Sequence, residues 1–94
     1  MMSSKPQNRQ SVSALRNLGP KSALMLTQAG ITSLDELQEL GAAKAYLRVK
    51  ALHPKLASLN LLWALAAGLE GRDWRELGPP EKELLLLQVR QLRR

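Results

Sequence analysis

Few residues in this chain could carry out catalysis or bind a metal ion. The sequence has no cysteine, which excludes disulfide bonds, thiolate metal sites and a cysteine nucleophile. Its single histidine, His53, cannot form a histidine metal site alone. Asp35, Glu36 and Glu39 are close in sequence, but their spacing is typical of a capped, solvated helix face rather than a catalytic carboxylate pair. We therefore expect no cofactor, no metal and no enzymatic activity.

The residues that could bind a ligand lie in a repeated segment. The pattern Leu-x-x-Leu-Gly-x-x-x-Ala occurs at residues 15–23 and again at residues 37–45. Glycine lets the chain turn tightly near a phosphate, and the free amides of the next helix point at the anion. We predict a DNA-backbone site formed by Asn17, Gly19, Lys21 and Ser22 in the first copy, and by Gly41, Ala43 and Lys44 in the second. The alternative is that both bends are only tight helix–helix corners.

The first copy resembles the helix-hairpin-helix motif, in which Gly-hydrophobic-Gly is followed by a small residue four places later. Here Asn17 stands in place of the first glycine, and asparagine tolerates a left-handed backbone better than most residues. The second copy has Glu39 at that place, where a carboxylate would repel a phosphate. Two such motifs related by a pseudo-dyad are a known arrangement for binding the DNA backbone. The resemblance therefore implies that both bends contact one duplex.

The distribution of charge also favours a phosphate-bearing partner. The formal net charge is +6, and residues 1–34 contribute four bases and no acid. Residues 35–55 have four bases and three acids, and residues 56–94 have six bases and five acids. Clustered positive charge attracts nucleic acid. Arg48, Lys50 and Lys55 are interpreted as ordinary solvated surface charge.

The composition predicts an all-α fold. Leucine occurs 21 times and alanine 11 times, against three valines, one isoleucine and two threonines, with 3% aromatic residues. Leucine and alanine favour helices, whereas strands favour β-branched and aromatic residues. We predict a compact five- or six-helix domain with two helix-hairpin-helix-like repeats around a buried central helix at about 55–70. The first expected helix is short and begins at Ser11 or Ser13, the second runs from Pro20 to Gly30, and the third begins at a capping box formed by Ser33 and Glu36. The remaining helices are expected at about residues 42–52, at 55–70, as one turn from Asp73, and from 81 to about 92.

Side-chain patterns within these helices predict the core. The helix at 42–52 directs Ala45, Tyr46, Val49 and Leu52 inward. Two tryptophans are expected to be structural, with Trp63 in the core and Trp74 packed beneath the last helix.

The organisation of the chain is expected to be simple. Residues 1–10 are polar and predict a disordered tail without a secretory signal, and residues 11–94 predict a single domain. The longest apolar stretch, residues 56–69, is shorter than the ~20 residues of a membrane span. We therefore expect a soluble, cytoplasmic protein.

The C-terminal helix contains four consecutive leucines at residues 84–87, more than one helix face can bury. We expect part of this surface to bind a partner or a second copy, which would form a homo-oligomer. The candidate interface residues are Leu84, Leu86, Leu87 and Val89.

Five blocks of the sequence resemble the C-terminal domain of the TfoX/Sxy family of bacterial competence regulators. They are LRNLGPKSA (15–23), AGITSLDEL (29–37), LGAAKAY (40–46), LNLLWAL (59–65) and DWREL (73–77), and the resemblance covers about residues 12–88. It implies a role in expressing DNA-uptake genes together with the cyclic-AMP receptor protein. Family members commonly have an additional N-terminal domain, so this sequence looks like a stand-alone C-terminal module.

The function expected from these features is a non-catalytic regulatory module that contacts duplex DNA non-specifically through its backbone. The alternative is a protein–protein interaction adaptor that uses the leucine-rich C-terminal helix and does not bind DNA. Binding of duplex DNA at several salt concentrations distinguishes the two.

Overall fold

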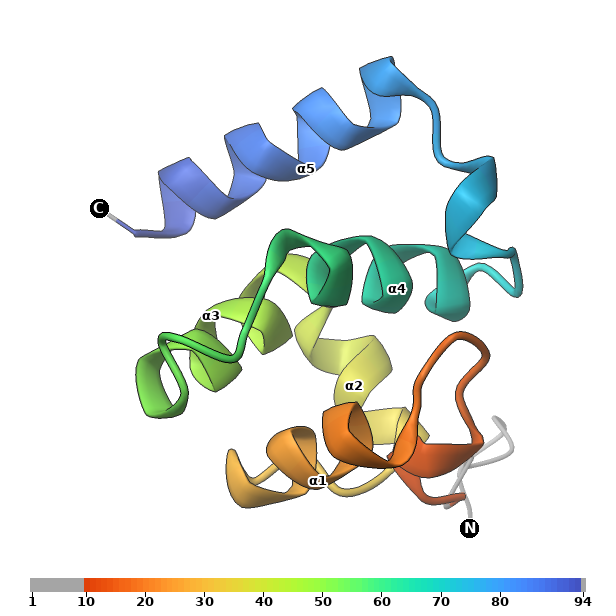
Figure 1. The fold of residues 1–94 in the computed structure, drawn as a ribbon, viewed down its shortest axis with the longest axis vertical. Coiled ribbons are helices and arrows are strands. Elements are labelled where there is room, and N and C mark those ends of the chain that lie inside the picture. The colour runs from red at the N-terminus through yellow and green to blue at the C-terminus, as the bar shows by residue number, and fades with distance from the viewer. Residues whose placement is uncertain (1–9, 94) are drawn as a thin grey trace, which may run out of the picture.

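The computed structural model describes residues 10–93, in which all regular elements are helical (Figure 1). Nine of the ten residues of the predicted N-terminal tail lie outside this range. The elements are η1 (Val12–Ala14), α1 (Pro20–Gln28), α2 (Leu34–Leu40), α3 (Ala42–Leu52), α4 (Leu59–Leu69), η2 (Trp74–Glu76) and α5 (Pro79–Leu92), where η denotes a single 3-10 turn. The all-α prediction is confirmed. Between residues 10 and 93, no helix is long and apolar enough to cross a membrane.

Local sequence signals set most of the helix ends. Pro20 occupies the first turn of α1, where its missing N–H is not needed. The capping box that opens α2 is confirmed: the Ser33 hydroxyl accepts from the Glu36 amide at 3.2 Å, and the Glu36 carboxylate accepts from the Ser33 amide at 3.1 Å. The Thr32 amide and hydroxyl, together with the Ser33 amide, lower the pKa of Glu36. Gly30 and Gly41 follow α1 and α2 at φ +85° and +84°, conformations that suit glycine.

Two expected helices are shorter than their sequences indicate. The first is a single 3-10 turn, because the backbone is extended at Leu15 and left-handed at Asn17, with φ +78°. The central helix begins at Leu59 rather than at residue 55, because the chain forms a turn after Pro54 and enters α4 at Ser58.

The two sequence repeats meet in a pair of symmetric hydrogen bonds. Ser11 and Ser33 form an isolated antiparallel bridge, in which the Val12 amide donates to the Thr32 carbonyl at 3.2 Å and the Leu34 amide donates to the Gln10 carbonyl at 2.9 Å. Val12 and Leu34 occupy equivalent places in the repeat, as do Gln10 and Thr32. Exchanging the two copies therefore exchanges the two hydrogen bonds, which indicates an approximate two-fold relation at this point.

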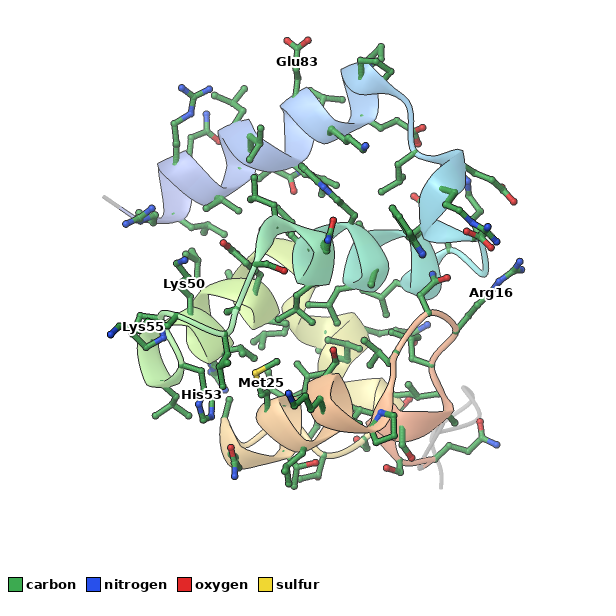
Figure 2. All side chains as sticks on the ribbon, in the orientation of Figure 1. Arg16, Met25, Lys50, His53, Lys55 and Glu83 are labelled. Atoms are coloured by element: carbon green, nitrogen blue, oxygen red, sulfur yellow. The ribbon has the colours of Figure 1, made fainter. Side chains whose placement is uncertain are left out.

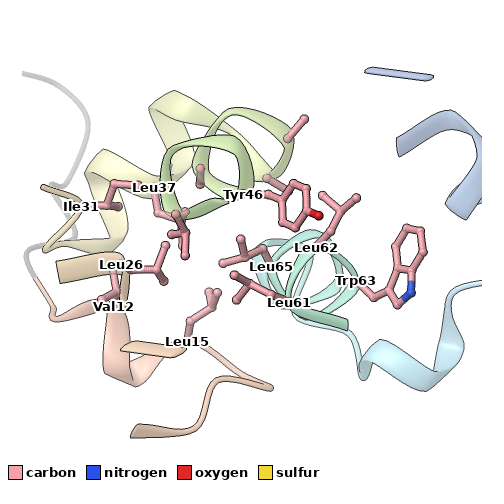
Figure 3. Close-up of a cluster of buried hydrophobic side chains, with 14 of the residues drawn as sticks. Val12, Leu15, Leu26, Ile31, Leu37, Tyr46, Leu61, Leu62, Trp63 and Leu65 are labelled. Carbon is pink, nitrogen blue, oxygen red and sulfur yellow. The ribbon is translucent and has the colours of Figure 1, made fainter. Parts of the chain in front are cut away.

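The core surrounds α4, as predicted. Most of its residues are buried, because it is apolar on nearly every face, packs against α3 and η2, and brings Gly68 against Leu15 and Arg16 of the first repeat. Figure 3 shows the α4 residues Leu61, Leu62 and Leu65 among side chains from the other helices. Trp63 is buried on the side of α4 that faces the C-terminal part of the chain, with Lys82 Nζ 5.5 Å from the centre of its ring.

Two predictions about the core are wrong. Leu52 is 54% exposed, because α3 ends there and no later segment covers this side chain. Trp74 is 40% exposed and lines a shallow cavity with Asn17 and Ser22 instead of packing beneath the last helix. The short turn η2 holds its backbone against the first repeat, which directs the indole toward this cavity.

Candidate nucleic-acid interface

The first bend, residues 15–19, is anchored to the segment that follows α4. The Asn17 side chain donates to the Arg72 carbonyl at 2.9 Å and accepts from the Trp74 amide at 3.3 Å. Arg16 donates to the Gly71 carbonyl at 3.0 Å. Gly68 of α4 packs against the same bend, where a Cβ atom would lie 2.5 Å from the Arg16 carbonyl oxygen. The side-chain amide of Asn17 is therefore hydrogen-bonded within the protein, and these bonds fix the position of the bend.

The remaining candidates of the first bend lie at the start of α1. Gly19 and Lys21 are exposed, and Ser22 is half-buried. Gly19 has no side chain to cap the helix, so the first backbone N–H groups of α1 have no capping partner and can donate to a ligand. Asp73 lies beside this bend, with its carboxylate 3.9 Å from the Arg16 guanidinium. An acidic neighbour opposes the approach of a phosphate.

The second bend, residues 40–42, lies against the C-terminal half of α5. Gly41 is half-buried and Ala43 is 6% exposed. Both line a cavity of about 280 Å³ with Gln88, Gln91 and Leu92. Lys44, the other candidate of this copy, is exposed.

The two bends are not structural copies of each other. Gly19 has an ordinary φ of −88°, whereas its counterpart Gly41 has φ +84°. In the first copy the left-handed residue is Asn17, whose counterpart Glu39 lies inside α2. The first bend contacts the chain near η2, and the second contacts α5. The symmetry at the Ser11–Ser33 bridge therefore does not extend to a pair of matching turns.

Most acidic residues after residue 69 pair with one arginine. Arg72 binds Glu81 at 2.6 Å and Glu70 at 2.9 Å, and it lies 3.6 Å from Glu76. Glu81, followed by Glu70, raises the pKa of Arg72. In return, the Arg72 side chain and the Gly78 amide lower the pKa of Glu81 to about 2. This acidic cluster surrounds η2.

Asp73 extends the acidic cluster toward the first bend. Its carboxylate accepts from the Arg75 side chain at 3.0 and 3.1 Å and from the Arg75 amide at 2.9 Å. The Arg75 side chain contributes most to lowering the pKa of Asp73 to about 2, and Arg16 adds a smaller effect. Asp73 also caps η2. The acids of this segment are thus charged and pair with nearby arginines.

Basic side chains gather on α3 and in the turn that follows it. Lys44 and Arg48 are four residues apart on the exposed side of α3, opposite the buried Ala45, Tyr46 and Val49. Both line a shallow depression of about 450 Å³, whose other residues are Leu40, Leu47, Ala51 and Leu92.

Lys50 and Lys55 lie close together on one side of the molecule, and Arg16 lies on the opposite side (Figure 2). Lys50 donates to the carbonyls of Pro54 and Ala57 at 3.2 and 3.3 Å, so it also fixes the turn after α3. We call Lys44, Arg48, Lys50 and Lys55 the basic face, in which Lys44 and Arg48 lie on one side of α3 and Lys50 and Lys55 lie at and beyond its C-terminal end.

Three residues of the basic face were interpreted from the sequence as solvated charge. The available signal was the spacing of Lys44 and Arg48, which places both on one side of α3. The sequence alone could not show that four of the eight acids pair with arginines around η2.

Two of the predicted interface residues on α5 are exposed. Leu84 is 61% exposed and Leu87 is 44% exposed, while Leu86 is half-buried. Val89 is buried in the chain's own core, so its place in a partner interface is wrong. The helical period explains why Val89 is buried while Leu84 and Leu87 are exposed. Val89 lies on the same side of α5 as Leu85 and Leu86, whereas Leu84 and Leu87 lie together on a different side.

Residues 10–93 contain no group of three potential metal ligands among histidine, cysteine, aspartate and glutamate. His53 pairs with an amide, since its Nε2 lies 2.7 Å from Gln28 Oε1.

The helices α1 to α5, packed around a core centred on the apolar α4, form a small all-α domain. The chain belongs to the family of the TfoX C-terminal domain, whose family model matches residues 8–89. It is 32% identical over 65 residues to the DNA transformation protein TfoX1 of Aliivibrio fischeri; the match covers 69% of this chain and 31% of that protein. The fold matches the crystal structure of an uncharacterized protein from Listeria monocytogenes, with a TM-score of 0.77, 27% identity, and coverage of 89% of this chain and 94% of the other.

Proposed function

We propose that this domain is a non-catalytic regulatory module of DNA transformation, which contacts the phosphate backbone of duplex DNA through the basic face. The observation that carries the proposal is the exposure of bases without acidic partners. Lys44, Arg48 and Lys55 are exposed and belong to none of the ion pairs within residues 10–93, whereas Arg16, Arg72 and Arg75 pair with acids. Such bases attract a polyanion.

The basic face is better suited to non-specific contact with the DNA backbone than to recognition of a particular base sequence. Lysine and arginine bind phosphates through charge, and these contacts carry no base preference. Within the described residues, this face has no long basic helix and no aromatic platform. The α3 side chains beside these bases are the half-buried Leu47 and the exposed Ala51 and Leu52, none of them aromatic. We therefore expect binding that depends strongly on salt and weakly on DNA sequence.

The link to transformation comes from the family. The relative from Aliivibrio fischeri is named a DNA transformation protein, and this chain spans less than a third of its length. A regulatory role beside the cyclic-AMP receptor protein, which the TfoX/Sxy resemblance implies, extends the proposal to a protein partner. Contact with chromosomal DNA would place the domain in the cytoplasm.

The second candidate function is that of a protein-interaction adaptor without DNA binding. The exposure of Leu84 and Leu87 on α5 favours it. The structure favours the basic face over the bends as the DNA site, because the first bend lies beside Asp73 and Ala43 of the second bend is buried.

The test is fluorescence anisotropy of a labelled duplex of arbitrary sequence at several salt concentrations. Each phosphate contact contributes about 0.9 to the slope of log affinity against log salt. Arg48→Glu is expected to weaken binding about tenfold or more and to reduce the slope by about one. Lys21→Glu changes the net charge equally but lies at the first bend, and we expect an effect of about twofold or less.

Two outcomes would contradict this assignment. A larger effect of Lys21→Glu than of Arg48→Glu would place the site at the first bend. No binding of the wild-type chain at low salt would exclude the DNA role and leave the adaptor.

A further inference from the structure

The outer face of α5 carries an apolar stripe that the described chain leaves exposed. Pro80, Leu84 and Leu87 follow one another at intervals of four and three residues, which places them on one side of the helix. The opposite side packs on the core through Leu85, Leu86 and Val89. Leucines at intervals of three and four residues are typical of a seam between two packed helices.

Two exposed charges of opposite sign border this stripe. Glu83 and Arg90 line the same shallow depression as Leu84 and Leu87. Figure 2 shows Glu83 pointing away from the rest of the molecule. Seven residues separate the two charges, about 10 Å along the helix, so they cannot pair with each other. None of the ion pairs within residues 10–93 includes either of them.

We propose that a second copy of this chain binds this face, with the two α5 helices antiparallel. A two-fold axis near residues 86 and 87 brings Glu83 of each copy to Arg90 of the other. The same rotation packs Leu84 of each copy against Leu87 of the other. A two-fold interface must be complementary to itself, and this spacing of charge and leucine satisfies that condition.

The charge pattern selects the antiparallel arrangement over the parallel one. Glu83 and Arg90 lie on the same flank of the stripe, so in a parallel two-fold pair the charges of the two copies would lie on opposite sides of the seam and no ion pair would form. In the antiparallel pair every exposed charge of the stripe meets its opposite. The seam is short because α5 has 14 residues, so we expect a weak dimer whose population rises with protein concentration.

Sedimentation velocity from micromolar to millimolar protein tests this proposal. The wild-type mass is expected to rise from that of one chain toward that of two. Glu83→Arg and Arg90→Glu should each raise the dissociation constant about tenfold, because each creates two like-charged pairs across the axis. The double variant restores both pairs with reversed sign, and it should dimerise as the wild type does.

Matched controls separate this effect from net charge and from folding. Glu39→Arg and Lys21→Glu change the net charge equally but lie on α2 and α1, and they should leave dimerisation unchanged. Leu84→Ser should abolish it with an unchanged circular dichroism spectrum, because this side chain is exposed in the single chain. A wild type that stays monomeric at millimolar concentration overturns the proposal, as does a double variant that fails to recover.

This inference is independent of the basic face. Leu84→Ser leaves Lys44 and Arg48 in place, so at concentrations below self-association it should bind DNA like the wild type. A wild type that binds DNA but stays monomeric contradicts the dimer alone, and a wild type that dimerises without binding DNA contradicts the proposed function alone.

Discussion

Replacing Gly68 by alanine tests the contact that joins α4 to the first bend. In an ordinary helix this change stabilises the protein by up to about 1 kcal/mol, because glycine has a poor helix propensity. Here the new Cβ would lie 2.5 Å from the Arg16 carbonyl oxygen and 2.9 Å from the Leu15 side chain. The carbonyl cannot rotate away freely, because Asn17 holds the bend to Arg72 and Trp74.

The expected net effect of Gly68→Ala is a loss of stability. Overpacking of this kind costs about 1–3 kcal/mol, which exceeds the gain in helix propensity. We expect the free energy of unfolding to fall by about 1–2 kcal/mol, equivalent to about 4–16 °C in the melting temperature of a domain of this size. Urea unfolding followed by circular dichroism measures the change.

Gly19→Ala is the matched control for this prediction. Nothing lies within 4 Å of a Cβ atom at Gly19, and its φ of −88° suits any residue. We expect its free energy of unfolding to change by less than about 0.5 kcal/mol. If Gly68→Ala instead stabilises the protein as alanine does in an open helix, the close approach of α4 and the first bend is refuted.

Two further predictions concern the segment around η2. Asn17→Ala should lower the free energy of unfolding by about 2–3 kcal/mol, since it removes the three hydrogen bonds of this side chain and leaves a Cβ atom at φ +78°. Asn17→Gly should recover about 1 kcal/mol of this loss in urea titrations. Equal losses for both variants would show that the backbone conformation adds nothing. Because the folded-state pKa of Glu81 is lowered from 4.5 to about 2, its stabilisation is present above about pH 4.5 and is lost as the pH falls toward 2. Glu81→Gln should therefore flatten the pH dependence of thermal unfolding in that window, and an unchanged profile would contradict the Arg72 pairing.

The sequence predicts the local features of the fold well. The capping box at Ser33 and the glycines after α1 and α2 act through neighbouring residues, so their signals are complete in the sequence. The repeat also predicts a real relation, since Ser11 pairs with its counterpart Ser33.

The candidate site could not be predicted in the same way, because it depends on contacts between distant segments. Asn17 and Glu39 are equivalent in the repeat, but the bonds of Asn17 to Arg72 and Trp74 give the first bend a conformation of its own. Similarly, Ala43 becomes buried only when α5 folds against α3. The acidic cluster also forms through tertiary pairing, as in the contact between Arg72 and Glu81.

The position of the DNA interface can be measured directly by amide chemical shifts during titration with a short duplex at low salt. We expect the largest changes at α3 residues 44–51 and at Lys55, and small changes at residues 17–22 beside Asp73. Changes confined to residues 17–22, with α3 unaffected, would contradict the proposal that the basic face binds the DNA backbone.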